Sequence, residues 1–146
     1  MYERVLVPTD GSDAATAAAE HAIDLAATCD ATVHALYVVD VRMSPISTGM
    51  DREAVLDLLD RSDHQPVASV TALAEAAGVP VVEAIRLGVP HETIRAHAAE
   101  HDIDLVVMGT HGRTGLERTL LGSVTERVLR TVDVPVLTVR GPIDDD

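Results

Sequence analysis

The sequence predicts an α/β fold: a single open, parallel five-stranded sheet with helices on both faces. Short apolar runs alternate with helical patterns along the 146 residues, which is the strand–helix–strand succession of a doubly wound sheet. The apolar runs are those of buried strands, as parallel sheets require. The length fits one domain, and no internal repeat or second domain divides the chain.

Five apolar runs predict five strands. In chain order they are Arg4–Pro8, Thr32–Val39, Pro80–Ile85, Ile103–Met108 and Val134–Val139. Parallel strands are joined by right-handed crossovers, which limits the topologies to consider. We expect the strand order 3-2-1-4-5, although the sequence pattern alone does not prove it.

Helical patterns fill the segments between the strands. The first begins after Ser12, a residue suited to cap a helix, and ends near Cys29. A long helical region is expected from Asp51 to Ala77, where Pro66 should kink or split it and Gly78 should close it.

Two helices are expected in the second half of the chain. Pro90 suits the first position of a helix that continues through Ile94 and Ala98. The last helix is expected at about Ser123–Thr131, and the acidic tail 142–146 is expected to be disordered.

The composition predicts an unusual core. Hydrophobic residues make up 47% of the chain, but there is no Phe and no Trp. The core must therefore be built from Val, Ile, Leu, Ala and Met. We expect β-branched strands packed closely against alanine-rich helices.

The charge excludes several classes of function. The formal net charge is −13 and every basic residue except histidine is Arg. A surface this acidic argues against binding to nucleic acid or anionic lipid, because neutralising phosphates requires basic patches. The absence of Lys excludes a Walker A loop and Schiff-base chemistry. The acidity is typical of a surface adapted to a salty cytoplasm, as in a halophile.

Targeting and redox features are few. No signal-peptide pattern opens the chain, and no apolar stretch is long enough to span a membrane, so we expect a cytoplasmic protein without membrane insertion. Cys29 is the only cysteine, which excludes an intramolecular disulfide, and we interpret it as structural rather than reactive.

Two loops follow strands at positions where open α/β sheets bind ligands. Pro8-Thr9-Asp10-Gly11-Ser12 follows the first strand, and Met108-Gly109-Thr110-His111-Gly112 follows the fourth. Ligands bind outside the carboxyl ends of strands, where the strand order reverses. The order 3-2-1-4-5 would make these two loops face each other.

The second loop continues into a helix start at Gly122-Ser123. Glycine there allows close backbone approach, and the free N–H groups and positive dipole end of the helix favour an anion. The segment from Arg113 to Arg130 carries four arginines and two glutamates, a net +2 within a chain at −13. These arginines indicate an anionic ligand, or they form ordinary surface pairs such as Arg130 with Glu126.

The glycine loop matches a family motif. Gly109-x2-Gly112-x9-Gly122-Ser123 resembles the Gly-x2-Gly-x9-Gly-Ser/Thr motif of the ATP-binding branch of the universal stress protein family. Further blocks resemble the family in the same order from about residue 2 to 140: Val5–Ser12, Leu36–Asp40, Gly88–Ile94, Asp104–Arg113 and Val134–Leu137. The resemblance implies a nucleotide-binding domain over residues 1–141, with a Rossmann-like fold similar to adenine nucleotide alpha hydrolases. Residues 41–65 carry no match, and Pro66 has no assigned role.

The resemblance also implies a ligand and its contacts. ATP, or AMP or ADP, would bind with Mg²⁺ or Mn²⁺ held through the phosphates and without assigned protein ligands. The implied contacts are the ribose side (Pro8, Thr9, Asp10), the adenine edge (the Val38 backbone), the ribose and phosphate lining (Met108, Gly109, Gly112, Arg113) and the phosphate donors (Gly122, Ser123, Val124). The family usually forms dimers, so we expect a homodimer through the edge strand Val134–Val139.

Three functions are compatible with these features. The first is a nucleotide-dependent regulatory or stress-response module with an unidentified protein partner. The second is a slow ATPase or nucleotide-transfer enzyme, against which no strong base can be named. The third is a dimeric adaptor that binds no nucleotide. We assign no catalytic residue, because Asp10 could hold a cation or merely brace its loop, and His111 is better interpreted as a loop residue near the ligand.

The other histidines suggest no metal site on sequence grounds. His97 and His101 are four residues apart and could share a helix face and a metal. The remaining ones are His21, His34, His64 and His91. We expect all six to occupy ordinary solvated positions.

Overall fold

The computed structural model describes residues 2–40, 66–110 and 121–141. Its helices and strands, in chain order, are β1 (Arg4–Pro8), α1 (Asp13–Cys29), β2 (Thr32–Asp40), α3 (Pro66–Ala76), β3 (Val81–Gly88), α4 (Pro90–Glu100), β4 (Leu105–Gly109), α5 (Ser123–Thr131) and β5 (Val136–Val139). No helix within these ranges is long and apolar enough to cross a membrane.

The sheet has the predicted topology. All paired strands are parallel, and their order is β3-β2-β1-β4-β5. The order reverses between β1 and β4, where Leu6 lies opposite Val106. The prediction of the order 3-2-1-4-5 is confirmed, and it places the switch point between the first and fourth strands.

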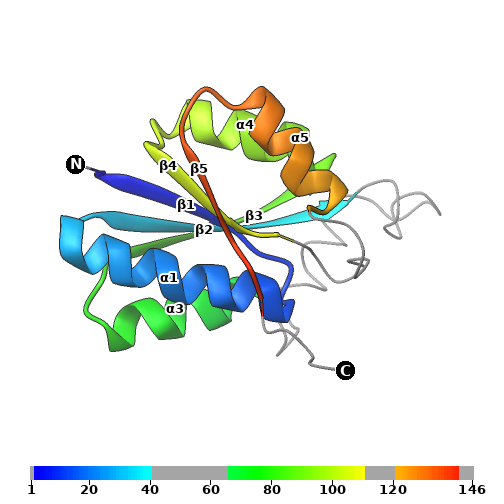
Figure 1. Ribbon diagram of the computed structural model, residues 1–146. Helices are drawn as coiled ribbons and strands as arrows, with labels where there is room; N and C mark the ends of the chain where they lie inside the picture. The colour runs from blue at the N-terminus through cyan, green and yellow to red at the C-terminus, as the bar shows by residue number, and fades with distance from the viewer. Residues whose placement is uncertain (1, 41–65, 111–120, 142–146) are drawn as a thin grey trace.

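Helices cover both faces of the sheet, as Figure 1 shows: α1 and α3 lie on one face and α4 and α5 on the other. The strand residues alternate accordingly. Val5 and Val7 of β1 pack in the cluster under α1 and α3, and Leu6 packs in the cluster under α4 and α5. Because successive side chains of a strand point to opposite faces, one apolar run supplies two cores.

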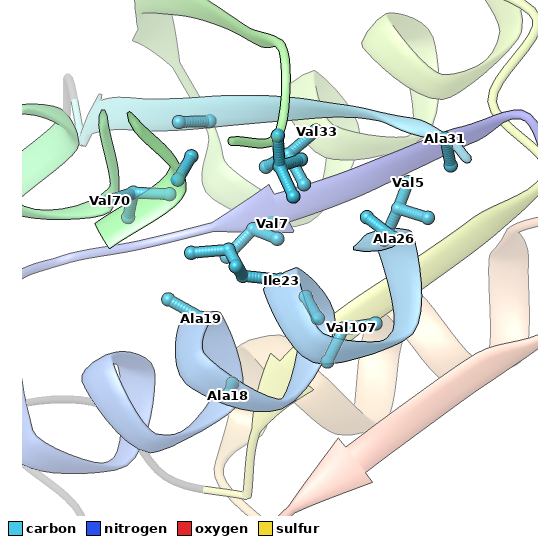
Figure 2. Close-up of a cluster of buried hydrophobic side chains, with 14 of the residues drawn as sticks. Val5, Val7, Ala18, Ala19, Ile23, Ala26, Ala31, Val33, Val70 and Val107 are labelled. Atoms are coloured by element: carbon cyan, nitrogen blue, oxygen red, sulfur yellow. The ribbon is translucent and has the colours of Figure 1, made fainter. Parts of the chain in front are cut away.

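Small side chains build the core on the α1 face. Ala18, Ala19, Ala22 and Ala26 of α1 are each at most 1% exposed and lie against strand valines such as Val107 (Figure 2). Among the described residues, the buried hydrophobic side chains are all Val, Leu, Ile, Ala or Met. This confirms the predicted core. Alanine lets the helix approach the sheet closely, which compensates for the missing aromatic volume.

The boundaries of four strands differ slightly from the predicted ones. β2 extends to Asp40 and β3 to Gly88, so both run past the purely apolar stretch. β4 begins at Leu105 because Ile103 belongs to the helix-terminating turn before it, where its N–H bonds the Ala98 carbonyl. β5 begins at Val136, two residues later than expected. Ladder pairing, which depends on the neighbouring strand, sets these limits.

The first helix agrees with its prediction. Of the long helical region predicted from Asp51 to Ala77, the structure describes the part from Pro66 onward. Ser12 caps α1 by accepting the Ala15 N–H. Pro66 is the first residue of α3, a position where its missing N–H costs nothing. The stretch from Asp51 to Gln65 lies outside the described residues, as does the tail 142–146.

Three helices end in the same way, with a left-handed residue followed by a buried apolar one. Gly78 (φ +71°) follows α3, and the Val79 N–H bonds the Ala74 carbonyl. Asp30 (φ 60°) and Asp102 (φ 51°) occupy the corresponding positions after α1 and α4. This is the Schellman type of helix ending, in which glycine is favoured.

We predict opposite effects of substitution at two of these endings. Gly78→Ala should lower the free energy of unfolding by about 1 kcal/mol, and Asp102→Gly should raise it by up to about 1 kcal/mol. A Cβ at Gly78 would meet nothing within 4 Å, so only the backbone conformation is affected. Urea unfolding of both variants measures this. Equal stability of Gly78→Ala and the wild type would contradict the assignment.

Candidate functional site

The carboxyl ends of β1, β2 and β4 meet at one edge of the sheet. The turn after β1 is tied to β2, because the Thr9 N–H donates to the Leu36 carbonyl at 2.8 Å. The end of β4 is tied to β5, because the Thr110 N–H donates to the Val139 carbonyl at 3.0 Å. Because β1 and β4 pair in parallel, the two loops that the sequence singled out begin side by side at the switch point.

The turn after β1 is held by its own side chains. The Asp10 Oδ1 accepts the Ser12 N–H at 3.0 Å, and the Thr9 Oγ1 accepts the Gly11 N–H at 3.2 Å. Gly11 has φ +81°, a conformation that glycine adopts without strain. Asp10 thus braces its loop, as one of its two interpretations required, and its carboxylate stays at the sheet edge.

The start of α5 is fastened to the end of β4. The Gly122 N–H donates to the Thr110 carbonyl at 2.6 Å. The buried Thr125 hydroxyl donates to the Gly109 carbonyl at 2.9 Å. These bonds hold the start of α5 against the end of β4, so the N-terminus of α5 lies at the same sheet edge.

The N-terminus of α5 has the features of an anion site. Gly122 is its N-cap (φ −68°, ψ 161°) and makes no side-chain capping bond. The N–H groups of Ser123 and Val124 in the first turn have no acceptor within the helix. Together with the dipole they favour a negative group. The Gly122 N–H, by contrast, is already engaged by Thr110.

Gly109 is required for packing as well as for the loop. A Cβ on Gly109 would lie 2.7 Å from the carbonyl carbon of Ala14 and 2.8 Å from its Cβ. Gly141 approaches the same alanine, because its Cβ would lie 2.8 Å from the Ala14 Cα. The first turn of α1 is thus seated between two glycines. Sequence alone pointed to a ligand contact at Gly109, and the structure adds a steric role.

We predict that Gly109→Ala lowers the free energy of unfolding by about 2 kcal/mol, because backbone atoms of α1 must move. Urea unfolding without ligand measures it. Gly88→Ala is the matched control, since its Cβ would meet chiefly the end of the Thr93 side chain. Its effect should be smaller, and an equal cost for both would contradict the steric argument.

The structure describes most of the predicted contact residues. Those within the described ranges are Pro8, Thr9, Asp10, Val38, Met108, Gly109, Gly122, Ser123 and Val124. They belong to the ends of β1, β2 and β4 and to the start of α5. Val38 packs partly against the α4–α5 face, and Met108 is 6% exposed. Gly112, Arg113 and His111 lie outside the described residues.

The basic island is only partly described. Arg130 pairs with Glu126 at 2.8 Å, four residues apart on α5, so the ordinary surface-pair interpretation is confirmed for this arginine. Arg113 and Arg118 lie outside the described residues. Arg127 carries no assigned ligand contact.

The expectation of solvated histidines is wrong for His34 and His97, which are 8% and 2% exposed. His34 lies inside β2, and His97 on the α4 face turned to the sheet. Burial, followed by the neighbouring His101 and Arg86, lowers the pKa of His97 from 6.5 to about 4. Burial and the same His101 also lower the pKa of His34. The four-residue spacing of His97 and His101 was a signal, but only tertiary structure adds His34.

Comparison with known proteins gives a consistent result. A family model described as the Universal stress protein family matches residues 1–140. The universal stress protein MJ0531 of Methanocaldococcus jannaschii is 43% identical over 146 residues, which covers 97% of this chain and 84% of the relative. The solved structure of MJ0577 from the same organism superposes with a TM-score of 0.86 at 32% identity and covers 99% of both chains.

A nucleotide complex is among the similar solved structures. It is a universal stress protein in complex with cAMP, with a TM-score of 0.67 and 29% identity, covering 95% of this chain and 97% of the other.

Proposed function

The chain belongs to the universal stress protein family, and we propose that it is a member that binds ATP and acts as a nucleotide-dependent regulatory module. One observation carries the proposal. The N-terminus of α5, the end of β4 and the Asp10 turn converge at the switch point of the sheet. Three residues of the glycine motif that the structure describes, Gly109, Gly122 and Ser123, belong to the end of β4 and the start of α5.

The chemistry of the edge suits a nucleoside phosphate. An anion is favoured at the first turn of α5, where Ser123 and Val124 offer N–H groups and Ser123 a hydroxyl. Asp10 supplies a carboxylate suited to a ribose hydroxyl. The cAMP complex of a relative supports a nucleotide of this class.

The proposed contacts keep their predicted roles, with one refinement. Phosphate donation falls on Ser123 and Val124, since the Gly122 N–H bonds Thr110 and glycine there serves mainly to leave room. Mg²⁺ or Mn²⁺, when bound, would neutralise phosphate charge. The remaining proposed contacts are Pro8, Thr9, Asp10, Val38, Met108, Gly109, Gly112 and Arg113.

Isothermal titration of nucleotide-stripped protein with ATP and Mg²⁺ tests the proposal, at high salt because of the acidic surface. Saturable binding near one site per chain supports it. Absence of binding with ATP, ADP and AMP alike would contradict it and favour a nucleotide-independent adaptor. Phosphate release at saturating ATP would identify the chain as an ATPase instead.

We further propose that β5 pairs with a second copy of the chain. β5 is an edge strand, and an edge left unpaired invites such pairing. The Val106 N–H bonds the Pro135 carbonyl, and the Thr110 N–H bonds the Val139 carbonyl. Odd-numbered residues therefore face β4, so the N–H of Thr138 points away from it toward a partner.

We predict that Thr138→Pro converts a dimer into a folded monomer, since it removes an outward donor and leaves the bonds to β4 intact. Light scattering after size exclusion, with circular dichroism, measures this. Thr138→Val is the matched control and should remain dimeric. A dimeric proline variant would contradict an interface through β5.

A further inference from the structure

Three histidines from separate parts of the chain meet under α4. They are His34 on β2, His97 in the last turn of α4, and His101, which ends that helix. One potential ligand atom from each lies within 4.8 Å of the other two. The ring centroids are 4.1 Å apart for His97 and His101, 5.8 Å for His34 and His101, and 6.4 Å for His34 and His97.

Burial leaves several of these nitrogens without partners. Neither nitrogen of His97 makes a hydrogen bond within the described structure, and Nδ1 of His34 makes none. An unsatisfied buried polar atom costs about 1–3 kcal/mol, and here such atoms gather at one point. The neutral imidazole favoured by this burial is also the form that coordinates a metal.

Two arginines and one glutamate surround the cluster. Arg86 Nη1 pairs with Glu100 Oε2 at 2.9 Å, while Nη2 lies 3.4 Å from Nε2 of His101. The positive charge of Arg4 on β1 also lowers the pKa of His34. Arg86 opposes a cation but has Glu100 as its own partner, so it can keep that pair when His101 turns toward a metal.

We propose that His34, His97 and His101 form a binding site for a divalent transition metal, for which Zn²⁺ is the probe. Zinc binds imidazole nitrogen at about 2.0–2.1 Å, so tetrahedral ligand atoms lie about 3.3 Å apart. Side-chain movements of about 1 Å would shorten the nitrogen separations from at most 4.8 Å to this value. Water fills the fourth position from the open rim, where Arg86 is 33% and Glu100 55% exposed.

The site is separate from the nucleotide edge. His34 is the third residue of β2, whose far end carries Val38, and His101 follows the end of α4. The histidines thus lie toward the amino ends of the strands. A metal there would join β2 to α4 and stabilise the helix ending, and it does not depend on the proposed ATP site.

The test uses the full chain, freed of metal with a chelator that is then removed. Titration with Zn²⁺ alone should show one site per chain and raise the melting temperature. Co²⁺ should give the intense visible absorption of a four-coordinate ion. His101→Gln, half-buried and expected to fold, should weaken Zn²⁺ binding at least tenfold, and His34→Val should do the same.

Two further variants sharpen the result. His21→Ala, the matched control, removes an exposed histidine of α1 and should bind Zn²⁺ like the wild type. Arg86→Gln should bind it more tightly, because a neighbouring positive charge is lost. The proposal is overturned if Zn²⁺ does not bind, or if His34→Val and His101→Gln bind it with wild-type affinity and the metal therefore lies elsewhere.

Discussion

Gly122→Val should weaken ATP binding at least a hundredfold, about 3 kcal/mol. In the proposed site, the isopropyl group would occupy the space assigned to the phosphates at the N-terminus of α5 and would screen the N–H groups of Ser123 and Val124. The backbone tolerates it, because φ −68° and ψ 161° are ordinary for valine. The chain already carries such a residue at the N-cap of α4, where Val89 has φ −83° and ψ 122°. Calorimetric titration with ATP and Mg²⁺ measures the loss.

A graded control separates a blocked site from a damaged fold. Gly122→Ala should weaken binding less than valine does, because its side chain is smaller. The free energy of unfolding of both variants should lie within about 1–2 kcal/mol of the wild-type value, which is the usual size of an N-cap effect. Wild-type affinity in Gly122→Val would place the phosphates elsewhere.

The metal-free protein should lose about 3 kcal/mol of stability as the pH falls from 6.5 to about 4, owing to His97. Its pKa is lowered in the folded state, so below pH 6.5 the unfolded chain binds a proton that the folded chain does not. The loss ends near pH 4, where folded His97 is protonated as well. His34 acts in the same direction. Urea unfolding at constant ionic strength, with a chelator present, measures the effect.

His97→Leu is the variant that assigns this loss. It should make the stability profile less steep between pH 6.5 and 4, since His34 still contributes, while the exposed-site control His21→Ala should keep the wild-type slope. The other titrating groups are common to the wild type and the two variants, so the net charge that they gain as the pH falls cancels when the three stability profiles are compared. Asp104, whose pKa is lowered by the N–H groups of Glu3 and Arg4, begins to contribute below about pH 5 and is present in all three proteins. An unchanged slope in His97→Leu would exclude His97 as the cause.

Local sequence predicted most of the architecture. The apolar runs of Val5–Val7 and Leu105–Met108 indicated buried strands because both faces must be apolar under two helix layers. Ser12 and Pro90 marked helix starts through chemistry confined to a few residues. Strand ends were less accurate, as at Leu87 and Gly88 of β3, because pairing with β2 extends that strand beyond its own pattern.

Part of the candidate site was also predictable from residues that lie close together in the sequence. Gly109 and Gly122 stood out by spacing, since a phosphate loop is nearly continuous in sequence. The additional structural roles of these two glycines could not be predicted from that spacing. The contact of Gly109 with Ala14 and the bond from Gly122 to Thr110 depend on how segments pack. Contacts between distant residues leave no trace in the local pattern.

The sequence by itself determined the layered α/β fold, the aromatic-poor core and the resemblance to the family, whose membership the family model and a 43% identical relative then showed. Each follows from composition or from residues close together along the chain. Only the tertiary structure decided that His34 joins His97 and His101, and that α1 is seated against two glycines. The physical reason is burial: a polar side chain loses its water according to what covers it, and the covering residues come from other elements.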